Sequence, residues 1–272
     1  MSIDNENGDS FPFSVLLETI PLGSNVPRET LERNIVANAA SGFPFLLDEK
    51  FKHQDEPLAI VGGGPSLHDT IKDLRHFKHI MVCSSAHDHV IENGIYPQYA
   101  LFCDAMPNPP WFRHKRNDCT YLISTQCDPT LLNDLESCRV YLWDIFGSAP
   151  EATFQKRGQL NGGSTGALRA PALGMVLGFD DFHFFGMDSS FKEERFAYDD
   201  DTDTAESLHV SFEGKIFKTT LPLVAQAQDF EKLLTEYGHL FSVTVHGESL
   251  CASVWKDMCR KRDALFKREK AA

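Results

Sequence analysis

The stretch PLAIVGGGPSLHDTIKDL (57–74) decides the fold, because a short apolar run passes through three glycines directly into an amphipathic segment. The apolar run predicts a buried strand, and the apolar residues behind the glycines recur at helical spacing. Ser66, with Asp69 three residues later, predicts a capping box at the start of that helix. A strand, a glycine turn and a helix in this order are typical of phosphate-binding sites, in which the backbone approaches an anion closely.

The residues around this first glycine turn exclude some classes of nucleotide-binding motif. It is not a Walker A loop, because no Lys-Ser or Lys-Thr pair follows the glycines. It fits a dinucleotide fingerprint poorly, since Leu67 occupies the third glycine position and residues 82–85 hold no acidic side chain for a ribose. Hydride transfer from NAD is therefore disfavoured, and a tight structural turn without a ligand is the alternative. The candidate nucleotide-binding residues here are Gly62, Gly63, Gly64, Pro65, Ser66 and, at the end of the next strand, Ser84.

The alternation of apolar strands with helices or short crossovers continues along the chain. Further strands are predicted at HIMVCSSA (79–86), YALFCDA (99–105), TYLISTQ (120–126), RVYLWDIF (139–146) and FHFFGMD (182–188). Strands that are apolar on both faces indicate an α/β fold with a mostly parallel sheet and helices on both faces. In such folds ligands bind in the crevice at the carboxyl ends of the strands.

The chain divides into three predicted parts. Residues 1–54 form an N-terminal extension with one predicted helix, residues 55–250 form the α/β domain, and residues 251–272 form a basic C-terminal helix. Within the domain, LHVSFEGKIFKT (208–219) predicts a β-hairpin with Glu213 and Gly214 at the turn. A helix follows at 221–238, so the sheet carries a hairpin and helical C-terminal extension.

The composition limits the classes of partner and compartment. The 272 residues carry a net charge of −13, which argues against nucleic acid as a partner. No apolar run approaches the ~18 residues that a membrane span needs. The N-terminus, MSIDNENGDS, lacks the basic and apolar regions of a signal peptide. Seven cysteines without a CxxC pair indicate neither a disulfide framework nor a zinc cluster, so a cytoplasmic location is expected.

A second glycine turn opens the segment NGGSTGALRAPALGMVLGF (161–179), which predicts a helix rich in small residues. Such a turn can present backbone N–H groups and hydroxyls to an anion. Its candidate nucleotide-binding residues are Gly162, Gly163, Ser164 and Thr165. Pro171 is expected either to kink this helix or to start its regular part.

Carboxylates at two predicted strand ends are candidates for catalysis and for metal binding. Asp104 and Asp188 each close an apolar strand, where acidic side chains can hold Mg²⁺ or bind a substrate hydroxyl. A helix cap or turn role is the alternative for each. His246 precedes a glycine in another strand-to-turn segment and is a third candidate for catalysis. The acidic run at 199–203 lacks the spacing of a calcium loop and predicts a solvated loop.

Four of these segments together resemble the archaeal 6-hydroxymethylpterin diphosphokinase-like (MptE-like) family, which is related to motility-accessory flagellin glycosyltransferases. They are IVGGGPSL, YALFCDA, NGGSTGALRAPALGMVLGFDDFHFFGMDSSF and VTVHGESL. The GGGPSL element is also similar to a turn of CMP-sialic-acid sialyltransferases. The resemblance covers roughly residues 57–250 and implies a Rossmann-like nucleotide-binding transferase domain. Pro171 departs from the family pattern, in which this helix is normally free of proline.

The resemblance implies a transferase that moves diphosphate from ATP to a small hydroxylated acceptor with Mg²⁺. The two glycine turns would hold the nucleotide, and Asp104 and Asp188 would hold the metal or the substrate. A glycosyltransferase with a CMP-sugar donor is the alternative, and a non-catalytic nucleotide-binding module is an alternative of another class. The acceptor hydroxyl needs a base, for which Asp104, Asp188 and His246 are the candidates. A homodimer is compatible with the family.

Overall fold

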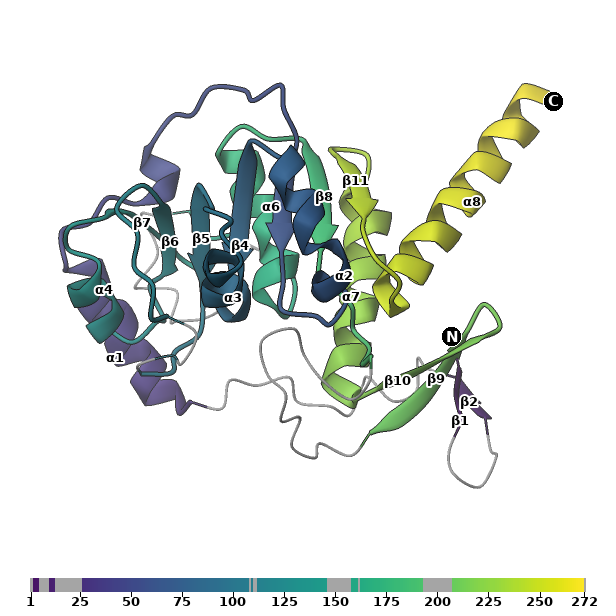
Figure 1. The fold of residues 1–272 in the computed structure, drawn as a ribbon, viewed down its shortest axis with the longest axis horizontal. Coiled ribbons are helices and arrows are strands. Elements are labelled where there is room, and N and C mark those ends of the chain that lie inside the picture. Colours follow the sequence, from purple (N-terminus) through teal and green to yellow (C-terminus); the bar gives the residue numbers. More distant parts are fainter. Residues whose placement is uncertain are drawn as a thin grey trace.

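The centre of the molecule is a seven-stranded parallel sheet in the order β11-β8-β3-β4-β5-β6-β7 (Figure 1). The computed structural model describes residues 2–4, 10–12, 26–107, 109, 112–145, 158–160, 162–192 and 207–271. The strands of the sheet are β3 (Leu58–Val61), β4 (His79–Cys83), β5 (Tyr99–Phe102), β6 (Thr120–Ser124), β7 (Arg139–Trp143), β8 (Asp181–Phe185) and β11 (Ser242–Val245). The predicted α/β class with a mostly parallel sheet is confirmed.

The strand order reverses at β3, and this reversal places the site. From β3 the chain adds β4, β5, β6 and β7 in one direction, and it then returns to pair β8 with the other side of β3. A parallel sheet binds ligands at such a topological switch point, outside the carboxyl ends of the strands. The first glycine turn follows β3 and the turn containing Gly186 follows β8, so both lie at the switch point.

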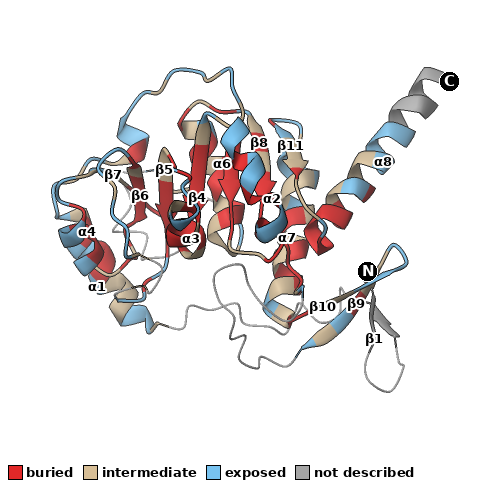
Figure 2. Ribbon diagram, viewed as in Figure 1, coloured by how far each residue is buried: buried red, intermediate tan, exposed pale blue. Residues whose placement is uncertain are grey.

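Helices cover both faces of the sheet, and each face has its own apolar core. On one face, α2 (Leu67–Thr70), α3 (His87–Glu92) and α4 (Thr130–Asp134) contribute to a cluster with side chains from β3 to β8. On the other face, α6 (Gly166–Val176), α7 (Leu221–Tyr237) and α8 (Leu250–Ala271) contribute to a second cluster. Figure 2 shows the burial concentrated in the strands and in the helix faces turned toward them. α1 (Arg28–Ala39) precedes the sheet and agrees with the predicted helix.

A smaller antiparallel sheet has the order β10-β9-β1-β2. Its members are β1 (Ser2–Asp4), β2 (Ser10–Pro12), β9 (Leu208–Phe212) and β10 (Lys215–Thr219). The predicted hairpin is confirmed: Glu213 and Gly214 have φ of 53° and 74°, as a two-residue turn with both residues left-handed requires. The strands β1 and β2 lie in the segment interpreted from sequence as an extension, and β1 pairs with β9.

The helix predicted behind the first glycine turn differs from the structure. α2 is only 4 residues long and continues as a 3-10 helix over Ile71–His76. The predicted capping box is wrong, because the Ser66 side chain makes no capping hydrogen bond within the helix. Its hydroxyl instead donates to Asp188 Oδ1 at 2.6 Å, so a partner far along the chain outcompetes the local one.

α6 contains Pro171 within its eleven residues, so the proline neither starts nor ends the helix. α8 begins at Leu250 and extends away from the body of the molecule (Figure 1).

Among the described helices, none combines the length and the apolar character that crossing a membrane requires. All seven cysteines are free thiols. The three-part division of the chain stays a prediction, and the acidic run at 199–203 lies outside the described residues.

Candidate functional site

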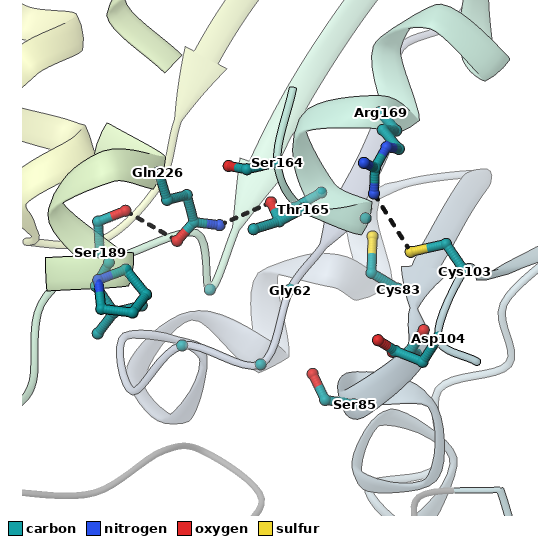
Figure 3. A pocket seen from close by; sticks show the side chains of 18 of the residues that line it. Gly62, Cys83, Ser85, Cys103, Asp104, Ser164, Thr165, Arg169, Ser189 and Gln226 are labelled. Atoms are coloured by element: carbon teal, nitrogen blue, oxygen red, sulfur yellow. Dashed lines mark hydrogen bonds between the residues drawn. The ribbon is translucent and has the colours of Figure 1, made fainter. Parts of the chain in front are cut away.

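A cavity of about 650 Å³ opens at the carboxyl ends of β3, β4, β5 and β8, and both glycine turns line it (Figure 3). The cavity therefore lies at the place where the strand order reverses. The sequence-predicted residues that line it are Gly62, Gly63, Gly64, Pro65, Ser84, Asp104, Ser164, Thr165 and Asp188. The predicted residues that are not among its lining are Ser66, Gly162, Gly163 and His246.

The glycines of the first turn are explained by close packing between two strand ends. A Cβ atom on Gly62 would lie 2.7 Å from the carbonyl oxygen of Gly186, and one on Gly64 would lie 2.6 Å from the same atom. Gly186 itself has φ of 59°, and a Cβ there would collide with the carbonyl oxygen of Gly62. The backbones of the turn after β3 and the turn after β8 thus approach each other at these glycines too closely for a Cβ atom, which only glycine permits.

The amide groups of the first turn are largely engaged within the protein. Gly62 N–H donates to the Phe185 carbonyl at 2.8 Å, and Gly64 N–H donates to the Gly186 carbonyl at 2.7 Å. Ser66 N–H donates to Asp188 Oδ2 at 2.6 Å. Within the described part of the chain, Gly63 N–H is the one amide of residues 62–66 that has no acceptor. This turn therefore offers an anion much less than its sequence suggests.

Asp188 holds the first glycine turn in place through hydrogen bonds from Ser66. Its carboxylate accepts both the Ser66 N–H and the Ser66 hydroxyl, each at 2.6 Å, and the residue is buried. Burial raises the pKa of Asp188 to about 6, and the two hydrogen bonds from Ser66 act in the opposite direction. Desolvation outweighs the hydrogen bonds here, so the carboxylate titrates closer to neutrality than an exposed one.

The second glycine turn is built differently. α6 begins at Gly166 behind Thr165, and no side chain caps its first N–H groups. No acidic residue occurs in its first turn either. Gly166 lets the helix start close to the strand ends, because a Cβ there would lie 3.2 Å from Leu101 Cδ2. The N-terminus of α6, with Gly166 and Ala167 lining the cavity, therefore presents unused backbone donors to it.

A side-chain network holds the second turn in place. Gln226 Nε2 on α7 donates to Thr165 Oγ1 at 2.9 Å, and Gln226 Oε1 accepts from the Ser189 hydroxyl at 2.9 Å (Figure 3). Ser189 is buried and has φ of 53°, an uncommon value for a residue with a side chain. Because Thr165 Oγ1 accepts from Gln226, the hydroxyl proton of Thr165 is available to another acceptor.

Arg169 lines the same cavity and was not among the sequence-predicted residues. It is the one Lys or Arg among the described residues that line the cavity. Its Nη1 lies 3.9 Å from Cys103 Sγ (Figure 3), and no described carboxylate is within ion-pair distance of its guanidinium. The sequence did carry a signal for it: an arginine in the first turn of a helix faces the positive end of the helix dipole and is unfavourable there without an anion.

Asp104 lines the cavity and is exposed to solvent. Crowding by surrounding protein atoms raises the pKa of Asp104, while the Ser84 hydroxyl and the charge of Arg169 act in the opposite direction. A carboxylate with a raised pKa is a better proton acceptor than an ordinary one. Of the three candidate bases, Asp104 is the one whose carboxylate is exposed to the cavity.

A bound Mg²⁺ would find only part of its ligands in the protein. Among the described residues, no group of three or more His, Cys, Asp or Glu is arranged to hold a metal. Mg²⁺ in nucleotide sites commonly takes one or two carboxylates and completes its shell with phosphate oxygens and water. Asp104 fits that smaller demand, whereas both oxygens of Asp188 already accept hydrogen bonds from Ser66. The residues present fit a metal that arrives with a phosphate.

The structure does not bring His246 to the cavity. Its ring stacks on Phe185 at 4.1 Å between centroids, and its Nε2 lies 2.9 Å from His183 Nδ1. Burial and the neighbouring His183 lower the pKa of His246. Phe185 belongs to the apolar cluster on the α2, α3 and α4 face, so the histidine lies beside that cluster rather than among the carboxylates.

Comparison with known proteins identifies related sequences and folds. The family model for 6-hydroxymethylpterin diphosphokinase MptE-like proteins matches residues 29–194. No curated protein matches the chain. Among solved structures, the MAf glycosyltransferase from Magnetospirillum magneticum AMB-1 superposes with a TM-score of 0.59 at 17% identity, over 91% of this chain and 43% of that one. The chain thus spans less than half the length of that structure.

Two mammalian sialyltransferase structures also align. One, in complex with Gal-beta-1-3GalNAc-ortho-nitrophenol, gives a TM-score of 0.42 at 7% identity over 83% of this chain and 88% of that one. The other gives 0.43 at 8% identity over 90% of this chain and 89% of that one. The fold likeness therefore rests on the MAf glycosyltransferase structure.

Proposed function

Because the chain belongs to the 6-hydroxymethylpterin diphosphokinase MptE-like family, we propose that it is a nucleotide-dependent transferase acting in the 650 Å³ cavity. The observation that carries this proposal is the single cavity shared by the second glycine turn, Arg169 and Asp104. It combines donors for an anion with a carboxylate able to accept a proton. Those are the two groups that transfer from a phosphorylated donor to a hydroxyl requires.

The first candidate reaction is diphosphate transfer, after the activity in the family's description. The acceptor hydroxyl oxygen attacks the β-phosphorus of ATP, and a new O–P bond forms. The bond between the β-phosphorus and the oxygen bridging it to the α-phosphorus breaks, and AMP leaves with that oxygen. The hydroxyl proton passes to Asp104. A Mg²⁺ bound to the phosphates would neutralise the charge that develops on them.

The second candidate is glycosyl transfer from a CMP-sugar, and one observation favours it specifically. The described lining of the cavity holds one arginine against two carboxylates, Asp104 and Asp188. A CMP-sugar has one phosphate group and ATP has three, so the CMP-sugar needs less positive charge from the protein. The fold likeness to a glycosyltransferase over 91% of the chain is compatible with this reaction. Here the acceptor oxygen attacks the anomeric carbon, the sugar–phosphate bond breaks, CMP leaves and the proton again passes to Asp104.

A thermal-shift series separates the candidates. The protein is heated with ATP, GTP, CMP or a CMP-sugar, each with and without Mg²⁺. Diphosphate transfer predicts stabilisation by ATP that requires Mg²⁺, because the metal must offset the phosphate charge. Glycosyl transfer predicts stabilisation by CMP or the CMP-sugar without metal. Stabilisation by none of them would contradict the proposal, and binding without any turnover would indicate a non-catalytic module.

Asp104→Asn tests the role of the base. We expect turnover to fall by about 10²–10⁴-fold, the range for loss of a general base, while the melting temperature changes little because Asp104 is exposed. Asp134→Asn, which changes the exposed carboxylate at the last residue of α4, is the matched control. Unchanged turnover in Asp104→Asn would remove Asp104 from the mechanism.

A further inference from the structure

We propose that Arg169 and the first turn of α6 bind the phosphate of the donor, so that the anion lies against the second glycine turn and not within the first. This inference rests on the proposed function, because it locates the charged part of the donor in the same cavity. It differs from the expectation that the sequence raises, in which the triple glycine of residues 62–64 is the main phosphate cradle.

Arg169 has no strong hydrogen-bond acceptor among the described residues. A guanidinium carries five N–H donors and prefers carboxylate or phosphate oxygens in a forked geometry. Among the described residues its hydrogen-bond acceptor is Cys103 Sγ, at 3.9 Å. Burial raises the pKa of the Cys103 thiol to about 11, so near neutral pH this sulfur carries no negative charge and is a weak acceptor. A half-buried arginine in this position has donors to spare for an anion in the cavity.

The electrostatics of the helix end independently favour an anion at this place. Arg169 lies in the first turn of α6, where the helix dipole is positive and where the helix itself supplies neither a capping side chain nor an acidic residue. Asp229 on α7 accepts the N–H of Ser164, before the helix begins, at 3.1 Å. The positive end of the helix dipole and the Arg169 guanidinium therefore both line the cavity and repel one another. A bound phosphate would turn that repulsion into attraction to both. The hydroxyl of Ser164, buried and without a hydrogen-bond partner among the described residues, is a further unused polar group of this turn.

The direction of the hydrogen bonds around Thr165 leaves a donor available at the second turn. Gln226 donates to Thr165 Oγ1, which leaves the Thr165 proton free to donate to a ligand oxygen. Ser189 fixes the orientation of Gln226 from its other side by donating to Gln226 Oε1. In the first turn, by contrast, Gly62 and Gly64 donate their amide protons to the carbonyls of Phe185 and Gly186 at the end of β8. At the second turn Ser164 N–H is taken by Asp229, but the first amides of α6 and the Thr165 hydroxyl proton stay available.

The test is isothermal titration calorimetry on the full chain with ATP plus Mg²⁺, CMP and inorganic pyrophosphate as probes. The variants are Arg169→Gln, Arg169→Lys and the control Arg139→Gln, which alters an exposed arginine at the start of β7 that does not line the cavity. Loss of a charge-assisted, forked contact is expected to weaken binding by about 10- to 100-fold in Arg169→Gln. Arg169→Lys keeps the charge but not the fork, so it retains part of the affinity.

The ionic-strength dependence of binding distinguishes a direct contact from a structural role. If Arg169 touches the phosphate, the affinity of the wild-type protein falls more steeply with salt than that of Arg169→Gln. Circular dichroism melting checks that each variant is folded, and Arg169→Lys provides the result if Arg169→Gln does not fold. Equal affinities and equal salt dependences for wild type and the folded variants would overturn the inference.

The proposed function and this inference fail in different ways. If the wild-type protein binds pyrophosphate but no nucleotide, and Arg169→Gln loses that binding, the anion site stands and the nucleotide-dependent transferase does not. If the wild type binds a nucleotide and Arg169→Gln binds it equally well, the transferase stands and the anion site does not. If the wild type binds none of the probes, both are overturned.

Discussion

The two glycine turns look alike in sequence and differ in what their backbones do. In the first turn, the N–H groups of Gly62 and Gly64 donate to carbonyls at the end of β8, and a side chain on either glycine would collide with Gly186. In the second turn, the first amides of α6 have no capping partner and open into the cavity. One turn uses glycine to let two strand ends meet, and the other uses it to leave a helix end accessible.

This difference shows that a glycine run before a helix has two physical causes that sequence cannot separate. Close approach of a second backbone and close approach of an anion both exclude a Cβ atom. The partner decides which cause applies, and for Gly62 and Gly64 the partner is Gly186, more than 120 residues further along the chain. Substitutions in the first turn should therefore change stability, and substitutions around the second should change ligand binding.

The largest effect is expected for Gly186→Ala. Its φ of 59° is unfavourable for a side chain, and the added Cβ would collide with the Gly62 carbonyl oxygen. We expect the free energy of unfolding to fall by roughly 3 kcal/mol or more, measured by urea denaturation. Gly214→Ala is the control, because Gly214 has φ of 74° with nothing within 4 Å, so it should lose only about 1–2 kcal/mol. Similar losses in both variants would mean that strand-end packing does not explain the first turn.

Asp188→Asn should give a smaller, pH-dependent effect. The amide preserves a hydrogen-bonded pair with Ser66 but cannot ionise. Burial raises the pKa of Asp188 from 3.8 to about 6. The stability of the wild-type protein relative to the variant is therefore greatest at low pH, and it falls as the pH rises through 6. The difference between the two proteins should change by roughly 3 kcal/mol at most between pH 4 and pH 8.

Denaturant unfolding at five pH values across that range measures the effect. Asp134→Asn, which removes an exposed carboxylate, controls for the general change in net charge. A stability difference between wild type and Asp188→Asn that is constant with pH would show that Asp188 does not titrate in this window.

The smallest effect on stability is expected for Gln226→Glu, which addresses the second turn. A carboxylate in place of the amide must accept from Thr165, so the Thr165 proton is no longer free for a ligand. It also brings negative charge near the anion site. We expect about 10-fold weaker nucleotide binding by calorimetry, with less than about 1 kcal/mol change in unfolding free energy. Gln226→Leu stays neutral and should weaken binding less. Equal weakening by both variants would show that neither the added negative charge nor the direction of the Gln226–Thr165 hydrogen bond controls binding.

Much of the fold follows from local pattern. The apolar runs at 58–61 and 79–83 form strands because each is buried on both faces, and the Glu213-Gly214 turn forms a hairpin because its backbone must be left-handed twice. The three-residue strands β1 and β2 were missed, since three residues are too few to show a period of two.

The site was less accessible to sequence, because its contacts join distant residues. The capping box failed because Ser66 finds Asp188, 122 residues away, instead of its own helix. Asp104 follows a strand and was identified for that reason. Arg169 was missed because its segment shows small and apolar residues, and only its position in the first helical turn signalled an unusual electrostatic environment.

The position of β3 between β4 and β8 also has a consequence for synthesis on the ribosome. After Val61 has emerged, about 120 further residues must be added before Asp181 begins β8. At about 5–20 residues per second this takes roughly 6–24 s. During that interval the nascent chain can pair β3 with β4 but leaves its other edge, a run of Leu, Ala, Ile and Val, without a neighbour. We expect this edge to be the part of the growing polypeptide that most needs shielding from other chains.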